Sequence, residues 1–328
     1  MSDRTPSEAG EGAWLARAAI RLGRERDPET ALRVGAALGR GWVRAGGPRV
    51  REAKVNLELA FPERTPAARA AILLASFENL GRSFAEVVLM HGRHRQQLID
   101  RVSVEGLQYL EEARAQSPHG GAFILTGHFG SWELGGAVFA SHGYPITSVH
   151  RSRGGGLDAL AKAWREASGQ EVVALGEAGL GALRAVRRGR LVLMLVDQNA
   201  RRREGVFAPF LGVSASTRFG PARLAVRLGV PVIPAFIHRV GSSADHVGRI
   251  LPPIPLRSEP KDPEEAAHVL GENVGRINQV LEGVVRKEPE QWVWAHRRFR
   301  TRPSGEPSLY PERGGALRRF RRWVRARG

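Results

Sequence analysis

The residues of this sequence whose types and spacing could do acid–base chemistry are His128 and Glu133, within GHFGSWELGG (Gly127–Gly136). The apolar run AFILT before this segment predicts a strand, and a helix is expected to begin near Ser131. A histidine on the turn and a carboxylate in the first helical turn can face each other. The carboxylate would hold the imidazole Nδ1–H and leave Nε2 as a general base. On spacing alone, a structural histidine at a strand end is the alternative.

Two further polar residues, Asp197 and Gln198, follow directly on the apolar run LVLMLV (191–196). In open α/β sheets, ligands gather at the carboxyl ends of the strands. Both residues are therefore candidates for substrate binding, with an aspartate that caps a loop as the alternative.

Positioning these side chains requires a regular framework, and the hydrophobic pattern from about residue 100 onward predicts one. Short apolar runs that read as strands alternate with stretches that read as helices. The strands are expected at 122–126, 146–149, 172–175, 191–196 and 230–237, and the helices at 131–142, 157–168, 178–188 and 218–228. This alternation predicts an α/β fold with a mainly parallel central sheet flanked by helices. Several runs are apolar throughout, as in strands covered on both faces.

Composition limits the classes of function. The chain has 328 residues and carries 50 Lys+Arg against 33 Asp+Glu, a net charge of +17. Such a balance points to an anionic partner: nucleic acid, an anionic membrane surface or an acidic protein. Cysteine is absent, which excludes a disulfide framework, a Cys-ligated metal site and a thiol nucleophile. No G-x-S-x-G, G-x-x-x-x-G-K-[ST] or H-E-x-x-H motif occurs, which disfavours a serine hydrolase, a P-loop nucleotidase and a zincin.

The N-terminal part is predicted to be helical, with two short helices in 13–45 and a longer one at 65–91. A basic amphipathic segment is expected near each end of the chain. Their apolar stripes are Leu15, Ala18, Ala19 and Leu22 beside Trp14 in the first, and Leu317, Phe320, Trp323 and Val324 in the second. Such segments are typical of interfacial membrane helices, or else of ordinary amphipathic helices and solvated helix ends. No run reaches the roughly 18 apolar residues of a membrane span, and no signal peptide is expected.

Four segments, taken in order, resemble one protein family. They are NLELAFPE (56–63), GHFGSWELGG (127–136), VDQNARRREGVFAPFLGVSASTRFG (196–220) and PEQWVWAHRRFRTRPSGEPSLY (289–310). The chain resembles the bacterial lipid A biosynthesis (late) acyltransferases. They belong to the wider lysophospholipid acyltransferase group, whose signature is a histidine, four residues and an acid. The resemblance covers roughly residues 10–310 and implies a glycerolipid acyltransferase-like fold.

The resemblance implies an enzyme that moves a fatty acyl chain from acyl carrier protein to a hydroxyl of a lipid A precursor or related glycolipid. His128 and Glu133 match the catalytic motif of the family. His128 would deprotonate the hydroxyl, the alkoxide would attack the thioester, and Glu133 would orient and stabilise the imidazolium. No covalent acyl-enzyme is needed, in agreement with the absence of cysteine, and no metal or organic cofactor is implied.

Two arginines, Arg151 in VHRSR and Arg165 in WREASG, stand where the family also carries an arginine, and both are candidates for substrate binding. The resemblance implies that Arg165 can pair with the motif carboxylate. The guanidinium fork of both residues suits a substrate phosphate. A surface arginine is the alternative for each.

The sequence departs from the family at its N-terminus. Typical members begin with a hydrophobic anchoring helix, whereas residues 13–45 contain seven arginines. We therefore expect peripheral association with anionic lipid at the cytoplasmic face of the inner membrane, and the same positive charge would attract the acidic acyl carrier protein. The expected organisation is a disordered tail (1–12), an N-terminal helical membrane-facing segment (13–100), an α/β acyltransferase core (101–310) and a basic amphipathic tail (311–328).

Two other functions are weighed against this one. The acceptor could be a different glycolipid or lysophospholipid, such as a phosphatidylinositol mannoside. A nucleic-acid-binding protein would also account for the charge of +17, but aromatic residues are only 7% and no recognised nucleic-acid module is present. No nucleic-acid partner is therefore expected.

Overall fold

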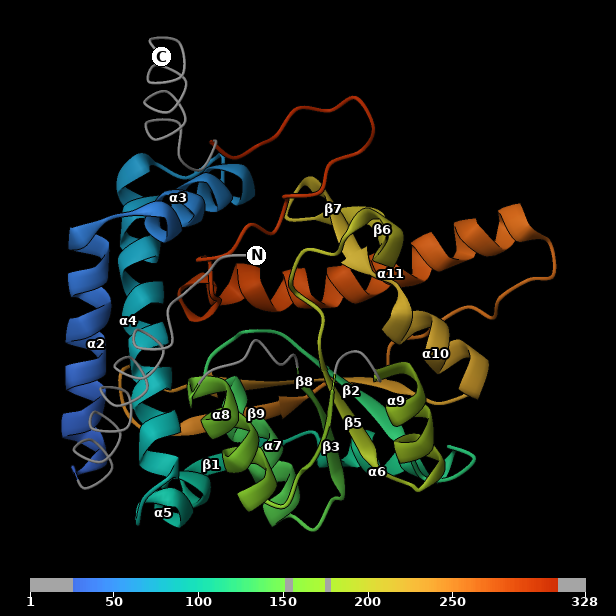
Figure 1. Cartoon of the computed structure of the whole chain (residues 1–328), viewed down its shortest axis with the longest axis horizontal. Helices are drawn as coiled ribbons and strands as arrows, with labels where there is room; N and C mark the ends of the chain where they lie inside the picture. Colours follow the sequence, from blue (N-terminus) through green and yellow to red (C-terminus); the bar gives the residue numbers. More distant parts are fainter. Residues whose placement is uncertain (1–25, 151–155, 175–177, 312–328) are drawn as a thin grey trace, which may run out of the picture.

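The computed structural model describes residues 26–150, 156–174 and 178–311 (Figure 1). The predicted tail at 1–12 and the two amphipathic stripes at 14–22 and 317–324 lie outside the described residues. The longer described helices are α2 (Pro28–Ala45), α3 (Pro48–Ala60), α4 (Pro66–Met90), α6 (Leu107–Ala115), α7 (Trp132–Ser141), α8 (Gly156–Ala167), α9 (Ala178–Arg187), α10 (Gly220–Leu228) and α11 (Pro263–Lys287). The shorter ones are α5 (Arg95–Asp100), η2 (Arg202–Glu204) and η3 (Pro289–Gln291).

Seven of the described strands form one sheet, in the order β1-β9-β8-β2-β5-β3-β4. Their bounds are β1 (Val102–Glu105), β2 (Ala122–Thr126), β3 (Ile146–His150), β4 (Glu171–Ala174), β5 (Leu191–Leu195), β8 (Val232–Arg239) and β9 (His246–Ile250). Strand β8 pairs with β9 antiparallel, and every other neighbouring pair is parallel. The predicted α/β class with a mainly parallel sheet is confirmed.

Helices cover both faces of the sheet. Along β2 the side chains alternate, so that Phe123 and Leu125 pack with α9, α10 and α11, while Ile124 packs with α6 and α7. All five residues of β2 are buried, which accounts for its continuous apolar run. The carboxyl ends of the central strands are thus fixed at one edge, where side chains can converge.

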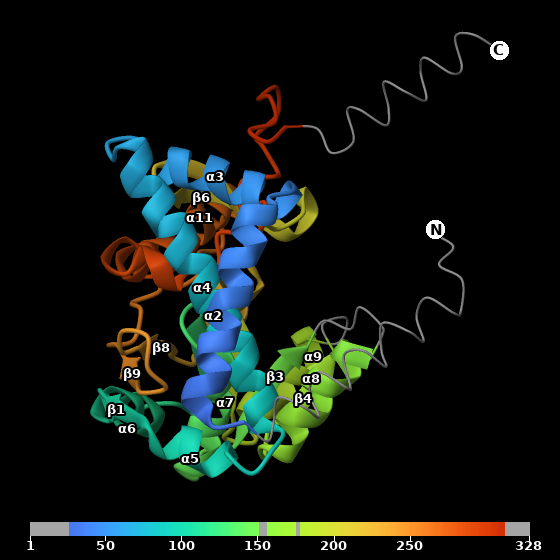
Figure 2. The same ribbon diagram turned by 90° about the vertical axis from the view of Figure 1, so that its left-hand side faces the viewer.

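The N-terminal helices form a separate layer at one side of the sheet (Figure 2). Helices α2 and α4 lie side by side, and their backbones approach closely at glycines. A Cβ atom on Gly39 would lie 2.1 Å from the Phe77 carbonyl oxygen, and one on Gly81 would lie 2.0 Å from that of Gly35. No helix among the described residues has the length and apolar character required to cross a bilayer.

The C-terminal segment after α11 packs between the first helices and the strand ends. Asn56 of α3 donates from Nδ2 to the carbonyl oxygens of Trp294 at 2.8 Å and His296 at 2.7 Å. The hairpin of β6 (Gly205–Phe210) and β7 (Val213–Arg218) packs on α11. The first, third and fourth of the resembling segments therefore share one aromatic core, which includes Phe61, Phe210, Trp292, Trp294 and Phe299.

Candidate active site

His128 lies on the loop between β2 and α7, and its immediate partner is Asp197. The imidazole Nδ1 is 2.8 Å from Asp197 Oδ1, and the His128 backbone N–H donates to Asp197 Oδ2 at 2.8 Å. Strands β2 and β5 are parallel neighbours in which Thr126 pairs with Leu195. Each of the two site residues follows its strand by two positions, so the sheet register itself brings them together.

The expectation that Glu133 holds His128 Nδ1 is wrong, because Asp197 occupies that position. Glu133 instead meets Arg165, whose Nη2 donates to Oε1 at 2.8 Å and whose Nε donates to Oε2 at 3.2 Å. The Trp132 indole N–H also lies 3.2 Å from Glu133 Oε1. The structure thus contains the pair between Arg165 and the motif carboxylate that the resemblance implies.

Asp197 was expected among the substrate-binding residues, but it lies behind the His128 ring with 0% of its surface exposed. Its Oδ2 also accepts a hydrogen bond from the Trp292 indole N–H at 3.0 Å. Burial alone would raise the pKa of Asp197, but the adjacent His128 outweighs it and holds the pKa well below its usual value. Asp197 is therefore a permanent anion that favours a proton on the imidazole.

His296 lies on the other side of Asp197, with its Nε2 3.3 Å from the Asp197 carbonyl oxygen. Burial lowers the pKa of His296 to about 4, against a smaller opposing effect of the Asp197 charge. At neutral pH this ring is uncharged, so His296 does not compete with His128 for the negative charge of Asp197.

Gln198 lies on the opposite side of the His128 ring from Asp197. Its side-chain Nε2 is 3.2 Å from His128 Nε2. An amide N–H can only donate, so this contact and the one to Asp197 both favour the tautomer with hydrogen on Nδ1. The lone pair on Nε2 is then the basic site.

A cavity of about 580 Å³ opens in front of the His128 ring. One part of its wall is polar and contains Glu133, His150, Arg165, Gln198, Asn199, Arg203, Glu204 and Arg218. The other part is mainly apolar and contains Trp132, Val149, Met194, Leu195, Phe219, Pro221 and Leu224. The apolar part of such a cavity can hold an apolar chain, and the polar part can hold a polar group, both beside His128.

Among the described residues, three arginine side chains reach this cavity, and only Arg165 was a candidate from the sequence. Arg165 is paired with Glu133, and Arg218 lies 3.0 Å from Glu204. Arg203 has no acidic partner among the residues that the structure describes. The signal for Arg203 was the run NARRREG directly after the strand that leads to Asp197.

The predicted residues thus fall into three groups. His128, Glu133, Arg165 and Gln198 line the cavity together, and Asp197 supports His128 from behind. Arg151 lies outside the described residues. No group of three or more potential metal-ligating side chains is present within 26–150, 156–174 and 178–311.

The loop of His128 is also held by the C-terminal segment. The Val293 N–H donates to the His128 carbonyl oxygen at 3.0 Å, and Phe129 forms a bridge with Trp292. Because Trp292 also bonds Asp197, one segment supports both members of the pair.

Comparison with known proteins identifies the family of this chain. The sequence model for bacterial lipid A biosynthesis acyltransferases matches residues 4–301. The lipid A biosynthesis palmitoleoyltransferase of Escherichia coli (strain K12) is 30% identical over 264 residues, 79% of this chain and 81% of that protein. The lauroyltransferase of the same strain is 28% identical over 279 residues, 85% and 88% of the two chains. Its myristoyltransferase is 26% identical over 300 residues, 91% and 90%.

Proposed function

The chain belongs to the bacterial lipid A biosynthesis acyltransferases, and on that basis we propose that it transfers a fatty acyl group from acyl carrier protein to a hydroxyl of a lipid A precursor. The enzyme class follows from the family. The donor, the acceptor and the mechanism are the proposal, and the observation that carries the mechanism is the His128–Asp197 pair beside the cavity.

The reaction begins with the acceptor hydroxyl at His128 Nε2, in place of the Gln198 amide. His128 removes the hydroxyl proton, and the oxygen attacks the thioester carbonyl carbon. The new C–O ester bond forms as the C–S bond breaks, and the departing thiolate takes the proton back from the imidazolium. Asp197 stabilises the imidazolium in between, as the carboxylate does in a Ser-His-Asp triad. The acyl group moves directly between substrates, with no acyl-enzyme.

The two parts of the cavity wall suit the two ends of such substrates. An acyl chain would lie against the apolar part, which includes Met194, Phe219 and Leu224. Phosphate groups would lie toward Arg203 and Arg218, since guanidinium groups bind phosphate through paired N–H donors.

The test uses the purified full-length chain with an acyl-loaded acyl carrier protein and a lipid A precursor. We expect mass spectrometry to detect the precursor with one added acyl group, and the mass of the protein to stay unchanged with donor alone. His128→Ala should abolish transfer. His142→Ala is the matched control, since His142 is an exposed histidine outside this cavity. Transfer by His128→Ala at near the wild-type rate would contradict the mechanism.

The acceptor is a membrane lipid under this proposal, so the enzyme must reach a bilayer surface. One face of helix α2 carries large exposed apolar side chains at intervals of four residues. Val34 is 55% exposed, Leu38 70% and Trp42 42%. Arginines flank this face, and the whole chain has a net charge of +17. These features support peripheral binding of α2 to an anionic lipid surface.

Co-sedimentation with anionic vesicles tests this part. Binding should weaken as salt is raised, because salt screens the electrostatic attraction, and Leu38→Glu should weaken it further. A protein that resists both high salt and alkaline carbonate would be integral to the membrane, which would contradict the peripheral assignment.

A further inference from the structure

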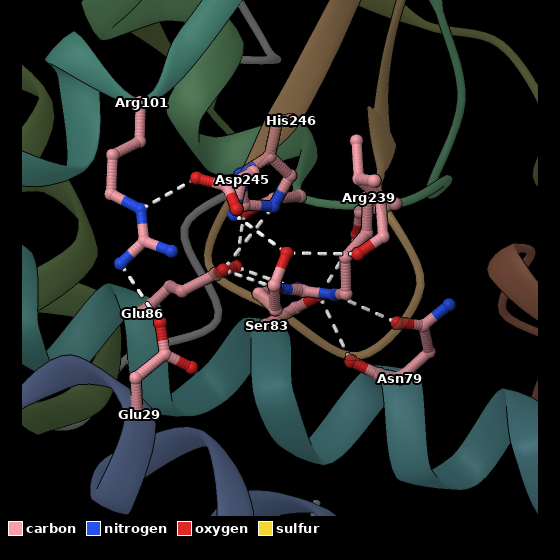
Figure 3. Close-up of polar contacts among 12 residues, drawn as sticks. Glu29, Asn79, Ser83, Glu86, Arg101, Arg239, Asp245 and His246 are labelled. Carbon is pink, nitrogen blue, oxygen red and sulfur yellow. Dashed lines mark hydrogen bonds and ion pairs between the residues drawn. The ribbon is translucent and has the colours of Figure 1, made fainter.

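A second buried polar cluster lies between α4 and the β8–β9 turn (Figure 3). Its centre is an ion pair of Glu86 on α4 with Arg239 at the end of β8, and both side chains are 0% exposed. His246, at the start of β9, brings Nε2 to 3.2 Å from the same carboxylate. Burial alone would raise the pKa of Glu86, but Arg239 and His246 outweigh it and hold the pKa below its usual value. The pair therefore stays ionised inside the protein.

Every N–H of the Arg239 guanidinium has a partner in this cluster. Nη1 and Nη2 both meet the Glu86 carboxylate, Nη2 at 2.8 Å from Oε2. The remaining N–H groups reach Asn79 Oδ1 at 2.9 Å, Ser83 Oγ at 3.4 Å and the Ser243 carbonyl at 3.2 Å. Asn79, Ser83 and Glu86 share one face of α4 because they are spaced by four and three residues. Five filled donors fix the guanidinium in one orientation.

Two hydroxyl groups connect this cluster to the loop between β2 and α7. Ser131 Oγ donates to Glu86 Oε2 at 2.5 Å, and Ser83 Oγ donates to the Gly130 carbonyl at 2.8 Å. Gly130 has a φ of 53°, and a Cβ atom there would lie 1.8 Å from the Ile237 carbonyl oxygen. The C-terminal half of the loop is therefore held in a single conformation from the α4 side.

A gain in folding stability does not by itself explain why such a cluster is buried. A buried ion pair is often no more stabilising than well-packed apolar residues of similar volume, because the loss of hydration offsets the attraction. Directional hydrogen bonds do, however, fix orientation. His128 lies two residues before Gly130, and its ring must keep both the bond to Asp197 and access to the cavity. A misplacement of about 1 Å can lower a rate about 100-fold.

We propose that Glu86 and Arg239, acting through Ser83 and Ser131, are positioning residues that set the orientation of the His128 ring. None of the four is among the residues that line the cavity beside His128. The effect on rate rests on the proposed function, whereas the effect on the ring does not.

The kinetic test compares Ser83→Ala, Ser131→Ala and the double variant in the full-length chain. We expect each single change to lower kcat about ten-fold and the double change about 100-fold, with KM unchanged. Glu86→Gln probes the ion pair directly, and the serine variants keep the test decisive if that protein does not fold.

Ser76→Ala is the matched control. Ser76 and Ser83 are both buried on α4 and both bond a carbonyl of their own helix, at 2.9 Å and 3.0 Å. Only Ser83 also meets the loop, because its single hydroxyl hydrogen is shared between the carbonyls of Asn79 and Gly130. Ser76→Ala should therefore lose some stability and keep the wild-type kcat.

NMR of ¹⁵N-labelled histidine rings gives a readout that does not depend on acyl transfer. In the wild type His128 should be the Nδ1–H tautomer, in the double serine variant a mixture, and in Ser76→Ala unchanged. If the wild type transfers no acyl group, the proposed function fails and the ring spectrum still decides the positioning role. An unchanged His128 spectrum in the double variant, or an unchanged kcat in an active enzyme, would overturn the proposal.

Discussion

Asp197 and Glu133 are the two carboxylates that the sequence analysis assigns to the site, and their surroundings differ. Asp197 is 0% exposed and binds the imidazole and two further N–H groups, one from the backbone and one from an indole. The Glu133 side chain is 18% exposed, lines the cavity and is held by the guanidinium of Arg165. The carboxylate that is distant in sequence orients the His128 imidazole, whereas the nearby one lines the cavity. The spacing within the motif therefore located residues of the site but did not predict which of them are hydrogen-bonded to each other.

The largest expected difference concerns the amide variants of the two carboxylates. Asp197→Asn should lower kcat about 10³- to 10⁴-fold, because an amide can donate to Nδ1 and so favours the wrong tautomer of His128. KM should change little, since Asp197 is buried behind the ring. Steady-state kinetics with saturating acceptor checks this. A Glu133→Gln enzyme that is more impaired than Asp197→Asn would reverse the assignment of the two roles.

A smaller effect is expected at the Glu133–Arg165 pair. Glu133→Gln and Arg165→Gln should each lower kcat/KM about 10- to 100-fold, because each leaves a partly buried charge without its partner. The double variant should be no worse than either single one, since the two side chains act as a unit. A double-mutant cycle measures this coupling, and strictly additive losses would show that the residues act separately.

A still smaller effect is expected at Arg203, a cationic residue of the cavity wall. Arg203→Ala should raise KM for a phosphorylated acceptor about 10-fold, since a charged hydrogen bond is worth about 1.5 kcal/mol, and should leave kcat unchanged. Arg201→Ala, two residues away and outside the cavity lining, is the control. An equal effect on a dephosphorylated acceptor, or on the donor alone, would show that Arg203 does not bind the acceptor phosphate.

The last prediction concerns stability, with no effect on the rate expected at neutral pH, and comes from His296 beside Asp197. The pKa of His296 is about 4 in the folded protein against 6.5 for the free side chain. Between these values the unfolded chain takes up a proton that the folded one does not, so stability falls as pH falls from 6.5 toward 4. Urea unfolding at pH 7 and pH 5 should differ by about 1–2 kcal/mol from this group. A His296→Gln variant with the same pH slope as the wild type would contradict the assignment.

Much of the sheet could be predicted from the sequence. The run at 122–126 coincides with β2, and the other predicted strands start within two residues of the observed ones, because strands covered on both faces are continuously apolar. The hairpin β6–β7 gave no such signal, since GVFAPF contains a glycine and a proline, and only half of its residues or fewer are buried in each strand. Helix α11 was also not predicted.

Which residues form the site could be predicted from the sequence better than how they contact each other. His128, Glu133, Arg165, Asp197 and Gln198 were all identified, yet the partner of His128 was misassigned. The contact with Asp197 depends on the order of strands, which places β5 beside β2, and hydrophobic pattern does not encode that order. Arg239 and Glu86 were not identified either, because single charged residues on a strand and a helix look like solvated ones until burial is known.

The hydrogen bonds from the C-terminal segment to the His128 loop have a consequence for synthesis on the ribosome. The chain is made from the N-terminus at about 5–20 residues per second, so His128 emerges well before Asp197 and long before Trp292 and Val293. Until those residues arrive, the imidazole lacks the anion that orients it and the loop lacks its bridge. Under the proposed mechanism, a nascent chain that ends before Trp292 would therefore not activate an acceptor hydroxyl efficiently, because Asp197 and the His128 loop still lack their bonds to the C-terminal segment.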